Sequence, residues 1–199
     1  MNLLHWWLNL SSTVLTFCMF AGTTANASGI MFFKERIDAI IRAQDTMEIR
    51  GVYWFINEDK SALSISIYYP FPVDSFSAYP HMIELERLPT NQPIPFDTLR
   101  EGIRWRMKIE SQAVDSVRVI YRQRVNHMRG KYIVTTAKHW GRPLQSADFS
   151  VSIPPQLSLD YWSFQYDSLS QKGDTIIYHR HSAPFSPDAD MLMRWQLQR

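Results

Sequence analysis

Short runs of alternating apolar and polar residues, separated by turn residues, are the feature that most constrains this sequence. In Ile103–Ile109 every second residue is apolar and those between are cationic, which is the period of a strand with one buried face. Leu63–Ile67 alternates in the same way with serines. Prolines, glycines and clusters of Asn or Asp lie between such runs, and we count about nine or ten of these strands.

No regular alternation of strand and helix patterns accompanies these runs, which excludes a βαβ architecture. We therefore expect an all-β protein, a single antiparallel β-sandwich of the immunoglobulin-like type. The stretch from Val117 to Pro154 is the richest in strand residues and predicts the central hairpin region. Within it we expect a strand over Lys131–Ala137 and a turn at Trp140–Pro143.

The two ends of the pattern leave alternatives open. Phe33, Ile37, Ile40 and Ile41 have helical spacing and predict a short N-terminal helix after the leader, although an irregular edge strand would also fit. Met191–Gln196 fits either a helix or a closing strand. We favour the strand, because every neighbouring segment has a period of two.

The first 27 residues contain no Lys, Arg, Asp or Glu. Their apolar run, Thr13–Ala21, precedes a small-x-small site that ends at Ala27, as in cleaved signal peptides. We expect residues 1–27 to be a signal peptide and residues 28–199 to be one β-sandwich domain of an exported protein, periplasmic, secreted or at the cell surface. The alternative is a retained membrane anchor, but a spanning helix needs roughly 20 apolar residues, so we expect no transmembrane span after cleavage.

Cys18 is the only cysteine and lies in the leader, so the mature chain has neither a disulfide nor a thiol nucleophile. The net charge of +2 is close to neutral, which argues against nucleic acid as a partner. Motifs for serine hydrolases, phosphate loops and zinc peptidases are missing from the sequence. These features favour a non-catalytic protein without a cofactor.

The block Thr135–Leu144, with Ala147, Phe149, Val151 and Pro154 after it, combines a strand, a Trp-x-x-Pro-Leu turn and a second strand. In this it resembles exported bacterial β-sandwich proteins of unknown function. The resemblance covers about a quarter of the chain. It implies an envelope location and a sandwich fold, and it carries over no active-site residue.

Basic residues form the most distinctive polar pattern. They occupy one face of each of two successive strand runs, as Arg104, Arg106 and Lys108, and as Arg118, Arg122 and Arg124. Because a short turn joins the runs, we expect antiparallel neighbours that present all six cations together and bind an anionic envelope polymer, phosphates or lipid head groups. The alternative is a solvated face whose cations pair with Glu84, Glu86 or Glu110.

His179 and His181 are two residues apart in a strand run, so both imidazoles would face the same side and could share a metal ion. The plainer alternative is a pair of surface histidines. A metal site needs a further ligand. The candidates are His81, His139, Asp188 and Asp190.

Trp54, Trp105, Trp140, Trp162 and Trp195 follow the leader. Aromatic residues on a solvent-facing sheet can stack on sugar rings, although they more often pack in a core. The sequence thus predicts an exported β-sandwich that serves as a binding or assembly module of the bacterial cell envelope, with an anionic polymer or another envelope protein as partner. The alternatives are a metal-dependent hydrolase that uses the two histidines, or a carbohydrate-binding module that uses exposed Trp and Tyr.

Overall fold

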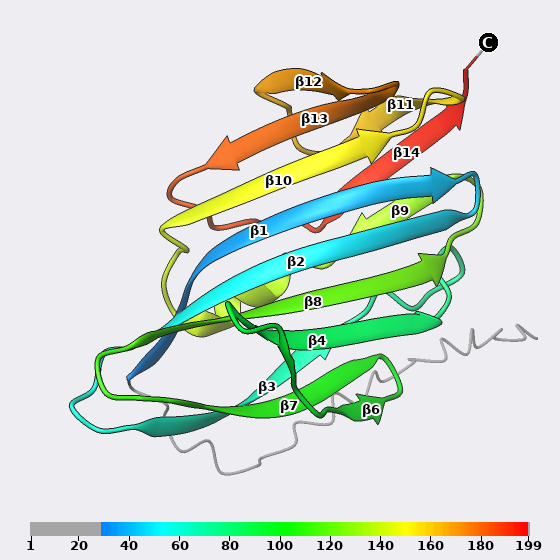
Figure 1. Ribbon diagram of the computed structural model, residues 1–199. Coiled ribbons are helices and arrows are strands. Elements are labelled where there is room, and N and C mark those ends of the chain that lie inside the picture. The colour runs from blue at the N-terminus through cyan, green and yellow to red at the C-terminus, as the bar shows by residue number, and fades with distance from the viewer. Residues whose placement is uncertain (1–28, 199) are drawn as a thin grey trace, which may run out of the picture.

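The computed structural model describes residues 29–198, in which fourteen strands and one 3-10 helix are found. Eight of these strands form one sheet in the order β12-β13-β10-β1-β2-β8-β4-β5, which is the front layer in Figure 1. Its strands are β1 (Ile30–Ala43), β2 (Thr46–Asn57), β4 (Met82–Leu88), β5 (Gln92–Pro93), β8 (Val114–Arg124), β10 (Ser146–Ile153), β12 (Ser168–Lys172) and β13 (Thr175–Ser182).

Two three-stranded sheets accompany the large one. Their orders are β11-β14-β9 and β3-β7-β6. In Figure 1 the first lies behind the upper half of the large sheet and the second lies at its lower end. Their elements, with the helix η1, are β3 (Leu63–Pro70), β6 (Asp97–Leu99), β7 (Gly102–Ile109), β9 (Arg129–Tyr132), β11 (Leu157–Trp162), β14 (Met191–Leu197) and η1 (Thr135–Trp140).

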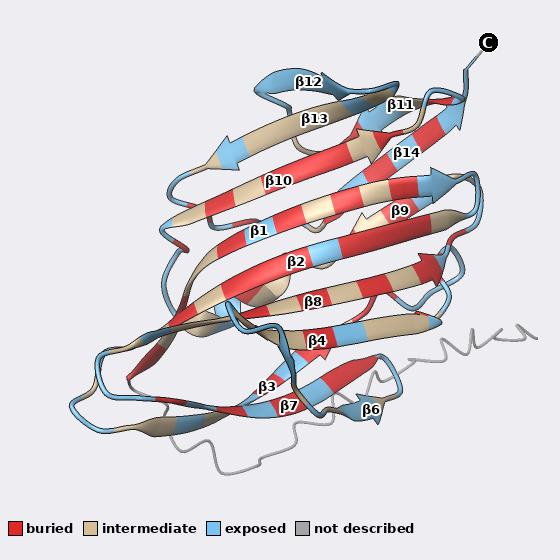
Figure 2. Cartoon of the chain, in the orientation of Figure 1, coloured by how far each residue is buried: buried red, intermediate tan, exposed pale blue. Residues whose placement is uncertain are grey.

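One hydrophobic core joins the three sheets. Ile37 of β1 and Ile49 of β2 are fully buried, and Figure 2 shows buried segments across the middle strands of the large sheet. Tyr121 of β8 packs on Tyr69 of β3 with ring centroids 6.2 Å apart, which ties the β3 sheet to the large one. The nearly all-β fold expected from the period-two runs is confirmed.

The expected N-terminal helix is wrong, because this segment is β1, an inner strand of the large sheet. A β-bulge at Phe33 explains the misleading spacing. Phe32 pairs with Phe55 and Lys34 pairs with Trp54, so Phe33 is an extra residue in β1. The extra residue shifts the phase of the alternation, and the apolar positions then imitate a helical stripe.

The expectation of a purely antiparallel, immunoglobulin-like sandwich also needs correction. β1 pairs with β10 in parallel, so the large sheet is mixed. The second layer is divided into two separate three-stranded sheets instead of forming one sheet. This division leaves room between the two small sheets.

The stretch from Val117 to Pro154 is not a central hairpin. β8 and β10 are separated by β2 and β1 in the large sheet, and the strand expected over Lys131–Ala137 ends at Tyr132, before η1. His127 and Met128, with φ of 57° and 51°, turn the chain out of the large sheet after β8. At the other end of the chain, the closing strand is confirmed as β14.

The expected signal peptide, residues 1–27, lies outside the described residues. Among the residues that are described, no helix has the length and apolar character needed to cross a membrane.

Candidate functional site

A cavity of about 960 Å³ lies where the second layer is divided. Its wall on the large sheet comes from β1 and β2, a second wall comes from the edge strand β3, and the segment from Tyr132 to Trp140 forms a third. The exposed residues Ser64, Ser66 and Tyr68 of β3 lie at its rim. Volumes of roughly 300–1,000 Å³ are typical of small-molecule sites.

Glu35 of β1 lines this cavity, which we call the Glu35 cavity, and is only 3% exposed. The bulge at Phe33 is what places it there. Ile30 and Phe32 face the interior, and an unbroken strand would turn Glu35 to the opposite side. After the extra residue, Glu35 faces inward together with Ile37.

The Glu35 carboxyl group is poorly satisfied. Its Oε1 atom is buried and has no hydrogen-bond partner. Burial raises the pKa of Glu35 from its ordinary value of 4.5 to about 8, because a charged carboxylate loses its hydration there. A buried acid with a raised pKa that lines a cavity marks a candidate functional group.

Three tyrosines stand beside Glu35. The Tyr53 hydroxyl lies 2.8 Å from the hydroxyls of both Tyr69 and Tyr132, so strands β2, β3 and β9 meet at one hydrogen-bonded cluster. Burial raises the pKa of all three phenols well above 10, and the Glu35 charge adds to that rise. The three hydroxyls therefore stay protonated.

Gly51 makes room for this cluster. A Cβ atom at Gly51 would lie 2.0 Å from the Tyr53 hydroxyl, since the phenol ring folds back over the glycine two residues before it. Any larger residue would therefore displace the tyrosine that joins the other two.

The remaining lining is mostly apolar and includes several aromatic rings. Phe32, Phe55 and Trp140 pack with ring centroids 5.4–5.9 Å apart. Trp105 of β7 also lines the cavity, and its indole N–H is buried without a partner. None of the described residues that line the cavity is a lysine or an arginine, so Glu35 has no cationic neighbour within it.

Polar contacts fix the wall that contains η1. Asp190 accepts hydrogen bonds from the backbone N–H groups of Val134 and Thr135, both at 3.2 Å, and from the Thr135 hydroxyl at 2.8 Å. Asp190 therefore anchors the start of η1. Asp188 instead forms an ion pair with Lys138 at 2.7 Å.

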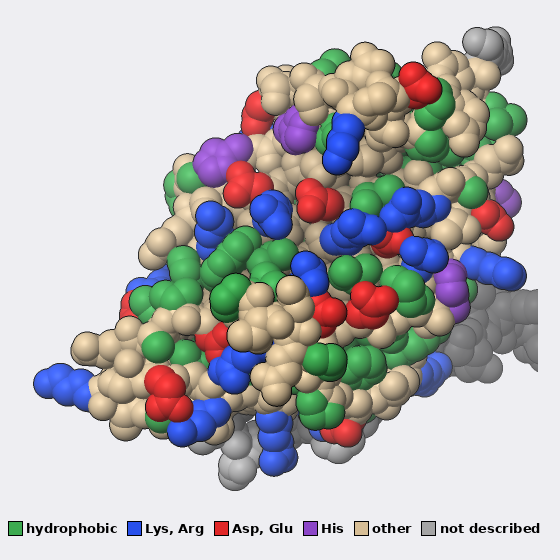
Figure 3. All heavy atoms as spheres, in the orientation of Figure 1, with side chains coloured by type: hydrophobic (Ala, Val, Ile, Leu, Met, Phe, Trp, Pro, Cys, Tyr) green, Lys and Arg blue, Asp and Glu red, His purple; other side chains and the backbone are tan. Residues whose placement is uncertain are grey.

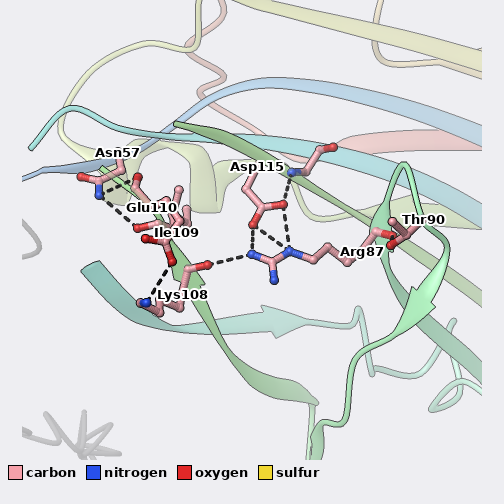
Figure 4. Close-up of polar contacts among 8 residues, drawn as sticks. Asn57, Arg87, Thr90, Lys108, Ile109, Glu110 and Asp115 are labelled. Carbon is pink, nitrogen blue, oxygen red and sulfur yellow. Dashed lines mark hydrogen bonds and ion pairs between the residues drawn. The ribbon is translucent and has the colours of Figure 1, made fainter. Parts of the chain in front are cut away.

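A second set of polar contacts holds the β3 sheet in place, as Figure 4 shows. Arg87 of β4 forms an ion pair with Asp115 of β8, and its guanidinium also donates to the backbone carbonyl of Lys108 in β7 at 2.7 Å. Asn57, at the end of β2, donates its side-chain amide to the carbonyl of Ile109 at 3.1 Å. We call these five residues the β7 clamp.

The predicted cationic face is divided between two sheets. Alternation places each set of three basic residues on one side of its strand, as expected. However, β7 pairs with β3 and β6, whereas β8 lies between β2 and β4. The chain turns a corner between Ile109 and Val114, so the hairpin does not form. Figure 3 shows acidic side chains among the basic ones on the front of the molecule.

Half of the six predicted cations are in ion pairs. These pairs are Arg118 with Glu86, Arg122 with Glu48, and Lys108 with Glu110. The other three, Arg104, Arg106 and Arg124, make no ion pair with another described side chain. Binding of an anionic polymer by these residues stays a prediction.

Glu48 of β2 forms ion pairs with three arginines of the large sheet. Its side chain is 1% exposed and pairs with Arg42, Arg50 and Arg122 at 2.7–2.8 Å. Burial alone would raise the pKa of Glu48, but the hydrogen bonds from the arginines outweigh it and lower the pKa to about 2. Arg122 is thus committed to a structural contact.

His179 and His181 lie on the same side of β13, as predicted, but they have different partners. The His179 ring is 2.6 Å from the Ser170 hydroxyl, and the His181 ring is 2.7 Å from the Asp148 carboxylate. Among residues 29–198, no three His, Cys, Asp or Glu side chains gather closely enough to hold a metal ion. The predicted metal site therefore lacks a third ligand there.

The aromatic residues divide between core and cavity. Trp162 and Trp195 are core residues, as the plainer alternative held. Trp54 lies on the outer side of the large sheet, where Lys34 approaches its ring centroid to 5.1 Å. Trp105 and Trp140 line the Glu35 cavity.

Comparison with known proteins adds a fold likeness. No protein family matches this sequence, and neither does any curated protein. A crystal structure from Legionella pneumophila, described as a "putative nutrient binding protein", superposes with a TM-score of 0.66 at 12% identity, over 84% of this chain and 67% of that one. The likeness is one of fold.

A two-domain M1 zinc metallopeptidase variant with bound L-arginine superposes with a TM-score of 0.51 at 7% identity. The match covers 83% of this chain but only 42% of the peptidase, so this chain corresponds to less than half of that enzyme.

Proposed function

We propose that this protein is a non-catalytic, exported binding module that holds a small organic molecule in the Glu35 cavity. One observation carries the proposal. Glu35, whose carboxyl oxygen Oε1 is buried without a hydrogen bond, lines a cavity of about 960 Å³. Such a group costs folding free energy unless a partner satisfies it, and a bound ligand would be that partner.

The lining supports binding more than catalysis. The cavity combines a few polar groups with a mostly apolar and aromatic wall, which is the usual composition of ligand sites. A catalytic carboxylate or nucleophile is normally oriented by a second group hydrogen-bonded to it, whereas Glu35 Oε1 has no such partner. The description of the Legionella protein as nutrient-binding agrees with this role, although the cavity itself carries the proposal.

Export is the second part of the proposal. It is supported by the apolar run Thr13–Ala21 and the small-x-small site at Ala25 to Ala27. A module of this kind would bind its ligand in the periplasm or at the cell surface.

Trp105 and Trp140 give a direct test, because both line the cavity and their fluorescence should respond to an occupant. We would screen amino acids, amines, sugars and nucleosides by tryptophan fluorescence and by melting temperature. The variant Ile65→Trp enlarges a half-buried side chain that lines the cavity, and Leu169→Trp, at an exposed position of strand β12, is the matched control. We expect Ile65→Trp to weaken binding by roughly tenfold or more, a loss of at least about 1.4 kcal/mol, and Leu169→Trp to bind normally. If no compound binds, or if both variants bind like the wild type, the cavity is not the ligand site.

A further inference from the structure

We propose that the ligand is an organic ammonium compound whose charged nitrogen pairs with Glu35 while its apolar body lies against the aromatic wall. This inference rests on the proposed function and specifies its ligand class. It follows from the charges and hydrogen-bonding groups that the cavity presents.

The balance of charge favours a cation. Glu35 is the only carboxylate among the lining residues, and no lysine or arginine in the described chain lines the cavity to neutralise it. An anionic ligand would meet an acid without a compensating cation. Calcium and magnesium prefer about six or more oxygen ligands, which one carboxylate and a few hydroxyls do not provide. A compact ammonium group needs fewer partners.

The tyrosine cluster leaves hydrogen-bonding capacity free. Tyr53, Tyr69 and Tyr132 carry one hydroxyl hydrogen each, and their two mutual contacts use two of the three. One hydrogen therefore remains for Glu35 or for a ligand. The hydroxyl oxygens also have lone pairs that can accept from an ammonium N–H.

The aromatic wall suits an ammonium group as well. Phe32, Phe55 and Trp140 pack together on one side of the cavity, and Tyr69 lies 6.4 Å from Trp105, centroid to centroid, on another. Aromatic ring faces attract cations, more strongly when water is excluded. The same rings would cover an alkyl or aryl body, so the wall can recognise both parts of such a ligand.

Ionisation of Glu35 should make this binding depend on pH. In the free protein burial holds the pKa of Glu35 at about 8, so binding a cation at lower pH must release a proton. The strands on either side of β1 are β2 and β10, and they place Tyr53 and Ala147 opposite Glu35. Trp105 of β7, which also lines the cavity, does not titrate. The other titratable residues around the cavity are Tyr53, Tyr68, Tyr69, Tyr132 and His139.

The test compares matched compounds by isothermal titration calorimetry on the intact protein. Phenethylamine and butylamine are the cations, phenethyl alcohol and butanol are their neutral counterparts, and hydrocinnamate is the anion. We expect each amine to bind at least tenfold more tightly than its alcohol. Its affinity should rise about tenfold per pH unit from pH 6 to 8 and then level off.

Two variants test whether Glu35 causes the preference for amines and its pH dependence. Glu35→Gln should abolish both the preference for amines and the pH dependence, whereas Glu84→Gln, the same change at an exposed position of β4 outside the cavity, should keep both. Circular dichroism and melting curves check that each variant is folded. Proton release by the wild type, measured in buffers of different ionisation enthalpy, gives a readout that needs no variant.

The outcomes separate this inference from the proposed function. Equal binding of amines and alcohols, tighter binding of hydrocinnamate, or a preference for amines that survives in Glu35→Gln would each overturn the ammonium ligand and leave a binding cavity. If the amines fail to bind while a neutral or anionic compound of the wider panel binds, the inference is likewise wrong. If nothing binds at all, both proposals fail.

Discussion

Two buried glutamates on adjacent strands have pKa values that are shifted in opposite directions. Glu48 on the outer side of β2 is held by three arginines, and its pKa is lowered to about 2. Glu35 on the inner side of β1 has no cationic partner in the cavity, and burial raises its pKa to about 8. The first carboxylate stabilises the sheet when charged, whereas the second destabilises the fold when charged.

This difference predicts the pH dependence of Glu35→Gln. From pH 4.5 to 8 the unfolded state has lost the Glu35 proton while the folded state keeps it, so the free energy of unfolding of the wild type falls as pH rises. We expect the stability of the wild type relative to Glu35→Gln to fall by about 4 kcal/mol over this range, since each pKa unit corresponds to about 1.4 kcal/mol. Urea unfolding at a series of pH values measures it; parallel curves would show that the Glu35 pKa is not raised.

The Glu35 site was not predicted from the sequence. In the structure the buried residues of β1 occupy even positions at Ile30 and Phe32 and odd positions from Glu35 onward. Such a change of phase marks a bulge. In the sequence, however, Met31 and Phe33 are apolar as well, so alternation before Glu35 gives no phase from which the bulge could be predicted. The tyrosine cluster had no local signal either, because its three members come from strands far apart in the chain.

At the scale of elements, alternation predicted the faces of strands but not their partners. In β7 the buried and exposed residues alternate as the sequence indicates, and so do those of β8. Their connection is short enough for a hairpin, yet the two strands join different sheets. What decides this is non-local, since the β7 clamp uses Asn57 and Arg87, which precede β7 by many residues.

The clamp leads to a prediction for Asn57→Ala. Asn57 is fully buried, and its amide donates to the carbonyls of Ser61 and Ile109. Leaving buried carbonyls without a donor should lower the free energy of unfolding by about 1–3 kcal/mol. Gln171→Ala is the control, because Gln171 makes a similar bond to a backbone carbonyl on an exposed strand. Chemical denaturation measures both; an equal loss in the two variants would argue against a structural role for the clamp.

At the scale of the whole molecule, the parallel pair β1–β10 organises the large sheet. β1 forms a local pair with β2, but its other edge is completed by Ser146–Ile153, more distant in the sequence. Alternation cannot reveal such a pair, because parallel and antiparallel neighbours have the same period. The sequence therefore predicted an all-β protein but not its mixed sheet or its divided second layer.

This pairing predicts how a shortened chain behaves. A fragment of residues 29–145 lacks β10, so the edge of β1 would be unpaired and its apolar face only partly covered. We expect the fragment to aggregate, and we expect co-expression with residues 146–198 to restore a soluble complex. Light scattering and circular dichroism test this; a soluble, folded fragment would show that β1 does not need β10.

The parallel pair β1–β10 also determines how late in synthesis the large sheet can be completed. Synthesis delivers β1 early, but its parallel partner arrives only after most of the chain has emerged. Until then one edge of β1 has no hydrogen-bonded partner, and an unpaired strand edge is prone to aggregate. The export proposed above would benefit from this delay, because a chain that cannot complete its central sheet would stay unfolded, as transport requires, until β10 is present.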